Sequence, residues 1–509
     1  MADKYLKDFD AESPNLTDYI IMTGGTGNDS DYKTLSSAMA QLLIETYAGS
    51  TLAGSQQSIQ SALSDVNKEV TSFNNYNLLS KMDGVNRTYN GVTFSWDKAN
   101  GTITASGTAS AQAFANLYSD QNELPDGIIP DCIYQFLMDQ SSVLEMRIGF
   151  YNGSTSLGAK SYKGNALVQI PSAATGMYIR ANVQKNAVVN ESVHFAMLNT
   201  KKSKHLKLEA GTFTVKEIVM LDGMTIEGSG NATILKVDAE DSTSFAIKMQ
   251  KGCTLKDIKI LGQNGNDWTP DGTITSAHGV LVNTYGNTEG TRNRIQISGI
   301  EISGFSGGGI CFDSTGVNYD NSANVSNAFI HNNNVGIYIP KKAEYNRICN
   351  AECARNYWGC INNGGNNLFS NCGFNGNVTA LLMDSTGITS PANDSHGSFA
   401  GCNFNHTHAF DNNTSLIAIN LIGQSSGELF SACTVAYGAI SISDSSGIVF
   451  ANCNFLSDSA VTVSNGGLTL FDGCVYKSAS VSPLTKTGSA VVKYADCYTW
   501  AGVPYDPAS

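Results

Sequence analysis

The sequence predicts an all-β protein: a right-handed parallel β-helix, preceded by an antiparallel β-sandwich and a short N-terminal helical or coiled-coil adaptor. Three observations predict this fold class. A six-residue phrase recurs down the C-terminal half, a second phrase of paired apolar residues accompanies it, and charged residues make up only 15% of the 509 residues. A repeat of this kind indicates a solenoid, in which each unit packs only against its neighbours.

The six-residue phrase reads: apolar, any residue, small or turn-forming, apolar or Cys, any residue, apolar. Five copies match it closely: FSNCGF at 369–374, FAGCNF at 399–404, FSACTV at 430–435, FANCNF at 450–455 and FDGCVY at 471–476. Looser copies begin at 221–226 and end at 494–499. From Ile300 to Cys497, the fourth positions of successive copies are 28, 23, 21, 30, 31, 20, 21 and 23 residues apart. The common minimum predicts coils of constant size whose extra residues form side loops.

The second phrase lies between copies of the first and predicts a further short strand in each coil. Its apolar pairs, which we expect to point inward, are Val280/Val282, Ile310/Phe312, Ile337/Ile339, Leu381/Met383, Ile417/Ile419, Ile440/Ile442 and Val461/Val463. Alternation with a period of two is typical of a strand with one buried face. The 50 Gly residues suit such coils, which need many turns.

The first 76 residues carry helical patterns. Residues 1–50 hold a polar, turn-rich start and a helical stretch at 35–48, and we interpret them as an adaptor. In residues 51–76, apolar side chains step by four and three positions, at Ile59, Leu63, Val66, Val70 and Phe73. This is a heptad seam two heptads long, and a helix this short is marginal alone. We therefore expect it to self-associate, with packing into a globular core as the alternative.

Residues 77–200 predict an antiparallel β-sandwich. Alternating runs of apolar and polar residues are separated by turns rich in Asn and Gly, and they lie at 92–96, 101–105, 144–150, 166–170 and 177–181. Sandwiches of this size bind sugars or act as spacers, and no residue of the segment decides between these roles from the sequence.

Residues 201–509 form the predicted β-helix, and their beginning carries a family resemblance. The segment LKLEAGTFTVKEIVMLDGMTIEGSGNATIL at 206–235 contains an aGtf turn, two strands and an I-x-G-x-G turn. In these features it resembles the first coil of the pectate-lyase-like β-helix superfamily. The order of adaptor, coiled segment, sandwich and β-helix is similar to that of bacteriophage tailspikes and preneck appendages. Residues 16–43 also resemble adaptor segments of phage tail proteins.

The resemblance implies a homotrimer that is attached to phage tail, baseplate or collar proteins through its N-terminus and binds or degrades bacterial cell-surface polysaccharide. It also implies a location in the virion, after synthesis in the host cytoplasm. We expect no signal peptide, because the N-terminus has neither a basic nor an apolar segment. The Asp-rich GDGxTDD opening of many such tailspikes is absent, which favours the receptor-binding members over the enzymatic ones.

Composition disfavours several other classes of protein. The net charge of −13 and the lack of a basic patch argue against nucleic-acid binding, and no run of 18 apolar residues predicts a membrane span. The twelve cysteines include no C-x-x-C pair, and five share one inward position, so we expect reduced core thiols and no metal site. No phosphate loop or dinucleotide fingerprint occurs, and we expect no cofactor.

Candidate catalytic residues follow from the alignment of successive coils. Equivalent residues of a β-helix lie about 4.8 Å apart from coil to coil, so residues at one offset from the phrase form a column. Asp320 and Glu344 precede their phrases by five and four residues, and Arg292 lies in the same column one coil earlier. Two carboxyl groups about 5–6 Å apart suit a retaining glycosidase, with solvated loop charges as the alternative. The flanking residues that we expect to bind substrate are Tyr319, Tyr345 and Arg347.

Aromatic residues concentrate in the side loops, where Trp268 and Trp358 are candidate platforms for sugar rings. Exposed aromatic faces bind the apolar faces of pyranoses, although an aromatic residue in a loop also serves as a packing anchor. We interpret the chain as a receptor-binding tail protein that recognises host glycan. The alternatives are a polysaccharide depolymerase on the same β-helix, either hydrolase or lyase, and a structural spike without glycan activity.

Overall fold

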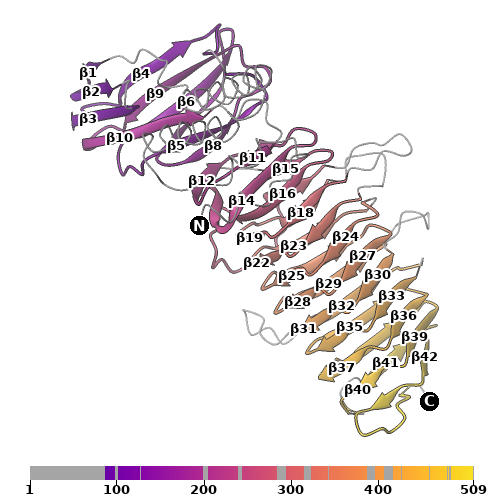
Figure 1. The fold of residues 1–509 in the computed structure, drawn as a ribbon. Coiled ribbons are helices and arrows are strands. Elements are labelled where there is room, and N and C mark those ends of the chain that lie inside the picture. The colour runs from indigo at the N-terminus through magenta and orange to yellow at the C-terminus, as the bar shows by residue number, and fades with distance from the viewer. Residues whose placement is uncertain are drawn as a thin grey trace, which may run out of the picture. The chain divides into compact units, whose positions relative to one another are not determined.

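The computed structural model describes residues 86–97, 101–125, 128–198, 205–238, 244–283, 294–313, 322–341, 343–386, 396–405, 416–425, 427–457, 459–478, 480 and 483–507. All of them belong to one compact unit of the chain, 77–509. These residues form strands and turns without a helix, which confirms the predicted all-β fold class (Figure 1). The predicted adaptor and coiled-coil segments, 1–50 and 51–76, lie outside the described residues.

The first ten strands form antiparallel layers around one apolar core. One layer contains β1 (Arg87–Tyr89), β2 (Val92–Asp97), β3 (Thr102–Thr108), β5 (Ile133–Met138), β8 (Ala166–Gln169) and β10 (Val188–Leu198). The other has the order β4 (Ala113–Asp120), β9 (Gly176–Val183), β6 (Glu145–Asn152) and β7 (Thr155–Tyr162). Alternate residues of β2 are buried, as the period of two in its sequence requires. This is the antiparallel sandwich that the alternating runs predict.

From β11 onward the strands are parallel and stack coil on coil (Figure 1). The first coils contain β11 (His205–Lys207), β12 (Gly211–Val215), β14 (Thr225–Val237) and β16 (Thr254–Leu261). The later coils place their strands in three ladders, which we call A, B and C. Each strand pairs in parallel with the equivalent strands of the coils before and after it, so the predicted parallel β-helix is confirmed.

Ladders A and B meet at the six-residue phrase. Ladder A contains β18 (Gln296–Ser298), β21 (Asn324–Ser326), β24 (Arg347–Cys349), β27 (Asn367–Ser370), β30 (Gly397–Ala400), β33 (Glu428–Ser431), β36 (Ile448–Ala451), β39 (Leu468–Asp472) and β42 (Val491–Ala495). Ladder B contains β19 (Glu301–Ser303), β22 (Phe329–His331), β25 (Glu352–Ala354), β28 (Gly373–Asn375), β31 (Asn403–Asn405), β34 (Thr434–Ala436), β37 (Asn454–Ser457), β40 (Val475–Tyr476) and β43 (Tyr498–Thr499).

Ladder C carries the second phrase. It contains β13 (Ile218–Val219), β15 (Phe245–Met249), β17 (His278–Val282), β20 (Gly308–Phe312), β23 (Val335–Ile339), β26 (Trp358–Asn362), β29 (Thr379–Asp384), β32 (Ile417–Ile422), β35 (Ala439–Ser443), β38 (Val461–Ser464) and β41 (Leu484–Thr487). One predicted inward pair is wrong: Ile419 is buried with Leu421, whereas Ile417 is half-buried. The period of two breaks there because Ala418 and Ile419 are buried in succession.

The third position of the phrase is a one-residue corner between ladders A and B. In the copy at 369–374, the first, fourth and sixth residues are buried, and the third, Asn371, has φ 53°. Positive φ between 48° and 63° recurs at Asp257, Gly299, Asn327, Asn350, Asn371, Gly401, Ala432, Asn452, Gly473 and Asp496. Gly and Asn adopt this left-handed conformation at low cost, which explains the turn-forming residue in the phrase.

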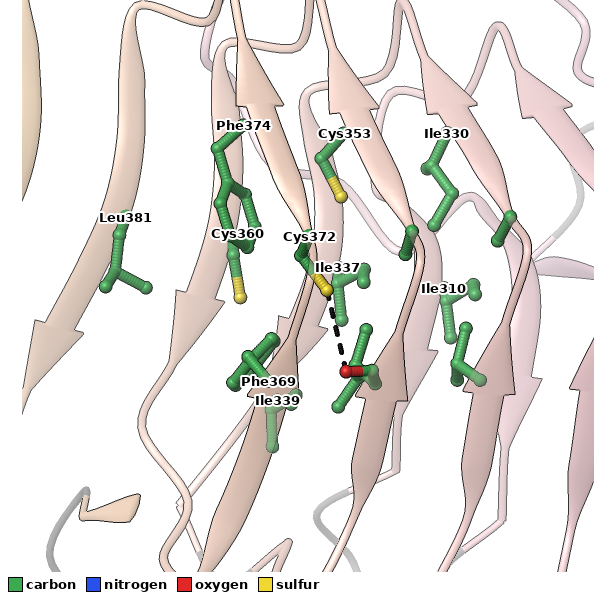
Figure 2. Close-up of a cluster of buried hydrophobic side chains, with 14 of the residues drawn as sticks. Ile310, Ile330, Ile337, Ile339, Cys353, Cys360, Phe369, Cys372, Phe374 and Leu381 are labelled. Carbon is green, nitrogen blue, oxygen red and sulfur yellow. Dashed lines mark hydrogen bonds between the residues drawn. The ribbon is translucent and has the colours of Figure 1, made fainter. Parts of the chain in front are cut away.

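The buried side chains repeat from coil to coil in register with the strands. The rings of Phe369, Phe399, Phe430, Phe450, Phe471 and Tyr494 stack in one column, with centroids 4.6–5.0 Å apart and planes within 11°. This distance matches the strand spacing of about 4.8 Å. All twelve cysteines are unpaired, and the five at the fourth position of the close copies are buried, as predicted. Figure 2 shows Cys353, Cys360 and Cys372 among Ile and Phe side chains. Burial raises the pKa of the Cys353 and Cys360 thiols, so they stay protonated.

Candidate functional site

The structure places only part of the predicted catalytic column. Arg292, Tyr319 and Asp320 lie outside the described residues. Glu344 lies between β23 and β24, is 4% exposed, and its Oε2 accepts a hydrogen bond of 3.1 Å from Nδ2 of Asn366. The Asp320–Glu344 pair therefore stays a prediction.

The two predicted neighbours of Glu344 that the structure describes both reach the surface. Tyr345 is 48% exposed and has φ 60°, and Arg347 is exposed at the first position of β24. Their role in substrate binding stays a prediction.

Asn366 lies on the coil after Glu344, and His396 lies beside Asn366 on the coil after that. Asn366 lies two positions before Leu368, and His396 lies two positions before Ser398. Leu368 and Ser398 are partners in ladder A. A Cβ on Gly365 would come within 2.4 Å of Cε1 of His396, so the imidazole packs directly on the Gly365 backbone. We call Glu344, Asn366 and His396 the Glu344 corner. The sequence places His396 in a long side insert but does not pair it with Glu344.

The two predicted tryptophan platforms are both half-buried. The carbonyl oxygen of Trp268, between β16 and β17, accepts a hydrogen bond of 2.8 Å from Nδ2 of Asn332. Trp358 is the first residue of β26, and its ring centroid lies 5.2 Å from that of Tyr357. The ring contact of Trp358 fits the packing-anchor alternative, and a role in sugar binding stays a prediction for both residues.

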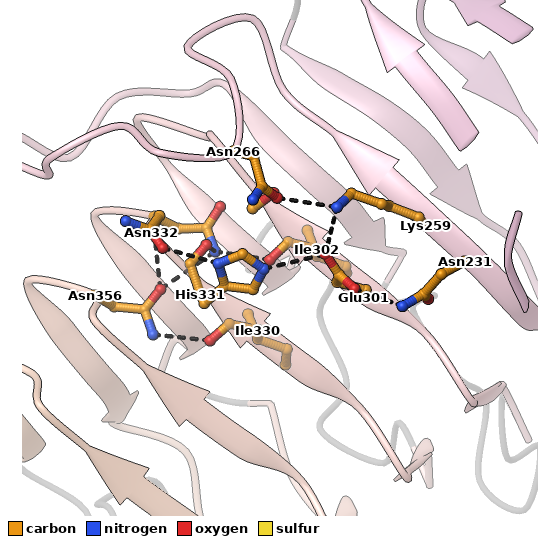
Figure 3. Close-up of polar contacts among 11 residues, drawn as sticks. Asn231, Lys259, Asn266, Glu301, Ile302, Ile330, His331, Asn332 and Asn356 are labelled. Carbon is orange, nitrogen blue, oxygen red and sulfur yellow. Dashed lines mark hydrogen bonds and ion pairs between the residues drawn. The ribbon is translucent and has the colours of Figure 1, made fainter. Parts of the chain in front are cut away.

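A polar cluster that the sequence analysis missed lies on the strands β16, β19 and β22 (Figure 3). Oε1 of Glu301 accepts a hydrogen bond of 2.5 Å from Nζ of Lys259 and lies 3.3 Å from Nε2 of His331. Oε2 of Glu301 accepts a hydrogen bond of 2.7 Å from Nδ2 of Asn231. Nζ of Lys259 also donates to Oδ1 of Asn266 at 3.0 Å. Lys259 and Glu301 meet because they are partners in the parallel register of β16 and β19.

This cluster keeps Glu301 ionised. Burial by itself would raise the pKa of the Glu301 carboxyl group, but hydrogen bonds from Lys259 and His331 outweigh burial and lower the pKa below its ordinary value. A general acid of glycoside hydrolysis needs a raised pKa. Glu301 is therefore suited to accept hydrogen bonds from a ligand rather than to donate a proton to it.

Phe329 is an exposed aromatic residue beside this cluster, with 39% of its surface accessible. In register, it lies between Glu301 on β19 and Glu352 on β25, so carboxylates flank the ring on both sides at a strand spacing of about 4.8 Å. The ring stacks on His331, with centroids 4.4 Å apart and planes at 24°. Nδ2 of Asn375 donates to Oε1 of Glu352 at 3.2 Å. We call Glu301, Phe329, His331 and Glu352 the Phe329 platform.

A departure from the repeat could have revealed this platform in the sequence. The fifth position of the phrase points outward, and the close copies place Gly373, Asn403, Thr434, Asn454 and Val475 there. The looser copy VSNAFI at 325–330 places Phe329 at the same position. A large aromatic side chain at an outward position leaves part of its ring in solvent, so it is a candidate for contact with a ligand.

Two kinds of site are missing from the described part of the chain. Within it, no three His, Cys, Asp or Glu side chains come together in a group that could hold a metal ion. The same residues include no helix of a length and hydropathy that would span a membrane.

Comparisons with known proteins find similarity in structure only. No protein-family model matches the chain, and no curated protein is similar to it in sequence. The catalytic domain of a GH87 alpha-1,3-glucanase in complex with tetrasaccharides has 13% identity and a TM-score of 0.39, over 82% of this chain and 96% of that one. The A-module of the Azotobacter vinelandii mannuronan C-5 epimerase AlgE4 has 13% identity and a TM-score of 0.38, over 58% of this chain and 86% of that one. Similarity at this level identifies no shared substrate or site.

Proposed function

We propose that this protein binds a polysaccharide of a bacterial cell surface through the outer face of its β-helix, as the receptor-binding part of a phage tail appendage. The observation that carries the proposal is the Phe329 platform. It combines an exposed ring with a carboxylate on each neighbouring strand. The face of an aromatic ring packs on the apolar face of a pyranose, while carboxylates accept hydrogen bonds from sugar hydroxyl groups.

The strands beyond the platform support the binding of an extended glycan. The outward residues that follow Glu352 along ladder B are Gly373, Asn403, Thr434 and Asn454, partners in successive registers. None is charged, and three of them carry hydrogen-bonding side chains. A glycan chain lying along the stack would meet such a group at most coils, about every 4.8 Å.

Virion location, trimerisation and attachment through residues 1–76 are further parts of the proposal. The order of the sequence segments and the heptad seam from Ile59 to Phe73 support them. Three platforms on one appendage would increase the avidity for a repeating polymer. Light scattering of the full-length protein tests this part separately, and a stable monomer contradicts it.

A glycan array of bacterial cell-surface polysaccharides tests the binding function. Phe329→Ala should lower the affinity for the bound glycan by about tenfold, because it removes the stacking surface. The matched control is Leu368→Ala, which removes an apolar side chain of similar exposure, 44%, from ladder A. It should bind as the wild type does. If Phe329→Ala and the wild type bind every glycan equally, the platform is not the binding site.

A depolymerase is the second candidate, and the Glu344 corner is the observation that favours it. A buried carboxyl group that is hydrogen-bonded to Asn366 on the next coil, with an imidazole one coil further on, provides groups that general acid–base catalysis uses. In that case Glu344→Gln and Asp320→Asn should each abolish the release of reducing ends from host polysaccharide and preserve glycan binding. Gly365→Ala should also impair release, because the new methyl group displaces His396. A wild-type protein that releases no reducing ends from the glycan it binds would exclude this candidate.

A further inference from the structure

The outer face of the sandwich sheet β4–β9–β6–β7 (Figure 1) places two arginines directly opposite each other. Arg147 on β6 and Arg180 on β9 are cross-strand partners, and their neighbours Ile148 and Ile179 point into the core. Like charges at directly opposite positions of an antiparallel pair are destabilising. In the free protein, repulsion between the two guanidinium groups therefore lowers the stability, and an anion bound between them would remove this repulsion.

Aromatic rings alternate with arginines from this face to β1 in the other layer. The guanidinium carbon of Arg180 lies 4.8 Å from the ring centroid of Phe114 and 4.4 Å from that of Tyr178. The guanidinium carbon of Arg87 lies 4.8 Å from the centroid of the same Phe114 ring and 4.3 Å from that of Tyr89. Stacking on aromatic faces holds each guanidinium group in a defined plane. The members of this row, which we call the arginine ladder, are Tyr89, Arg87, Phe114, Arg180, Tyr178 and Arg147.

Two hydrogen bonds and one close backbone contact hold Tyr178 at the centre of the ladder. Nε of Arg147 and Nη2 of Arg180 both lie within hydrogen-bonding distance of the Tyr178 hydroxyl group, at 3.3 and 3.4 Å. The hydroxyl end of the Tyr178 ring packs against Gly149, where a Cβ would approach Cε1 of the ring to 2.4 Å. Only Gly at position 149 leaves room for the ring, so the position of Tyr178 depends on this residue.

No carboxylate among the described residues forms an ion pair with the three arginines. Glu145 shares their face, but it accepts hydrogen bonds from Asn182 and Gln184 and forms an ion pair with Lys163. Nη2 of Arg87 and Nε of Arg180 are buried without a hydrogen-bond partner. Buried donors of a folded protein are nearly always satisfied, so these two indicate an absent acceptor. The chain has 44 acidic and 31 basic residues, and the ladder nevertheless holds three arginines that have no ion-pair partner among the described residues.

We propose that the arginine ladder binds the carboxylate groups of an acidic polysaccharide, of the uronic acid class. A planar guanidinium group binds a planar carboxylate through two parallel hydrogen bonds, and Arg147 and Arg180 present two such groups side by side. Tyr89, 37% exposed beside Arg87, provides a ring for the adjoining sugar. This site goes beyond the proposed function, because it gives the sandwich its own ligand, separate from the Phe329 platform.

Isothermal titration of the full-length protein with tetragalacturonate, and with its methyl ester as the uncharged analogue, tests the proposal. The acid should bind at least tenfold more tightly than the ester, and its affinity should fall with added salt. Arg180→Gln and Arg147→Gln should each weaken binding of the acid about tenfold or more. Arg180→Lys should also weaken it, because Lys keeps the charge but loses the planar fork. The control Lys251→Gln removes one exposed positive charge from the β-helix and should bind as the wild type does.

Equal affinity for the acid and the ester, or wild-type binding by Arg180→Gln, would overturn the proposal. Competition by millimolar inorganic phosphate as effective as that by galacturonate would also overturn it, because it would show a site for any anion. Thermal unfolding separates a binding role from a structural one: Arg147→Gln should not lower the melting temperature, since it removes one of two opposed like charges. Phe329→Ala should keep tetragalacturonate binding, so failure of the platform and failure of the ladder are distinguishable.

Discussion

The C-terminal coils of the β-helix and its middle coils share one repeat but fill it with different chemistry. From β30 to β42 the interior is a stack of rings and thiols, and the outward residues of ladder B are uncharged. From β16 to β28 the outer face carries Lys259, Glu301, His331 and Glu352. Apolar packing alone stabilises the regular coils, whereas each polar side chain of the middle coils requires a hydrogen-bond or ion-pair partner.

The interior of the middle coils shows the same contrast. Three buried asparagines, Asn333, Asn356 and Asn377, occupy equivalent positions on successive coils. Oδ1 of Asn356 accepts the backbone N–H of Asn333 at 3.0 Å, and Oδ1 of Asn377 accepts that of Asn356 at 2.9 Å. The Phe329 platform and the Glu344 corner lie in or next to these irregular coils. Departures from a repeat that packing alone would fill are therefore the places to look for function.

The largest effect is expected in the regular coils, from Cys433→Asp. Cys433 is fully buried, and its Sγ donates to the carbonyl oxygen of Phe399 at 3.3 Å. A carboxylate there would be buried without a partner, at a cost of at least about 4 kcal/mol in the free energy of unfolding. Cys433→Ser, which can reuse the carbonyl acceptor, should cost much less. Similar urea midpoints for the two variants would contradict the dry interior of these coils.

The next largest effect is a loss of stability of the early coils at acid pH, and it is caused by His278 of β17. Nδ1 of His278 accepts the backbone N–H of Gly308 at 2.8 Å, which requires that nitrogen to be unprotonated. Burial lowers the pKa of His278 from 6.5 to about 4, against a smaller raising effect of Asp313. As pH falls below 6.5, the unfolded chain takes up a proton that the folded chain does not.

The stabilisation by neutral His278 is therefore fully present above pH 6.5 and is lost as pH falls toward about 4. The shift corresponds to a loss of about 3 kcal/mol. His278→Asn keeps an acceptor but does not titrate, so its free energy of unfolding should vary less across this range. Parallel pH profiles for the variant and the wild type would show that His278 is not buried in the neutral form.

A smaller loss is expected from Asn356→Leu in the asparagine row. Leu has a similar volume but leaves the backbone N–H of Asn333 without its acceptor, at a cost of about 2 kcal/mol. The control is Asn403→Leu, because the Asn403 side chain is half-buried on the outer face and its Oδ1 has no hydrogen-bond partner. Urea denaturation should distinguish the two, and equal midpoints would show that the row contributes nothing beyond packing.

The smallest expected effect is a stabilisation. It tests the one-residue corner that the middle and the C-terminal coils share. Ala432 occupies the corner of the copy FSACTV with φ 52°, where equivalent positions hold Asn371 and Asn452. The left-handed conformation costs Ala about 1 kcal/mol relative to residues that tolerate it, so Ala432→Asn should stabilise the protein by about that amount. Ala400→Asn, in an extended strand, should give no gain. A destabilised Ala432→Asn variant would contradict the corner geometry.

Most of the β-helix could be predicted because burial acts on each coil in the same way. Inward positions must be apolar and the corner needs a left-handed residue, so both requirements recur in the sequence as the six-residue phrase. The prediction failed at Ile417 because two successive residues, Ala418 and Ile419, are buried where the pairing of β32 with β35 shifts register. The predicted inward position of Cys433 was confirmed, since packing alone selects it.

Outward residues follow no such rule, so the sequence predicted almost none of the contacts among them. Glu301, Phe329 and Glu352 become neighbours only through the parallel register of β19, β22 and β25. Arg87, Phe114 and Arg180 lie far apart in the chain and meet only when the sandwich closes. The sequence by itself determined the coil, its corners and its interior, because each depends on the burial and backbone conformation of single residues. Only the tertiary structure decided which surface side chains stand together, because strand register brings together residues that no local pattern connects.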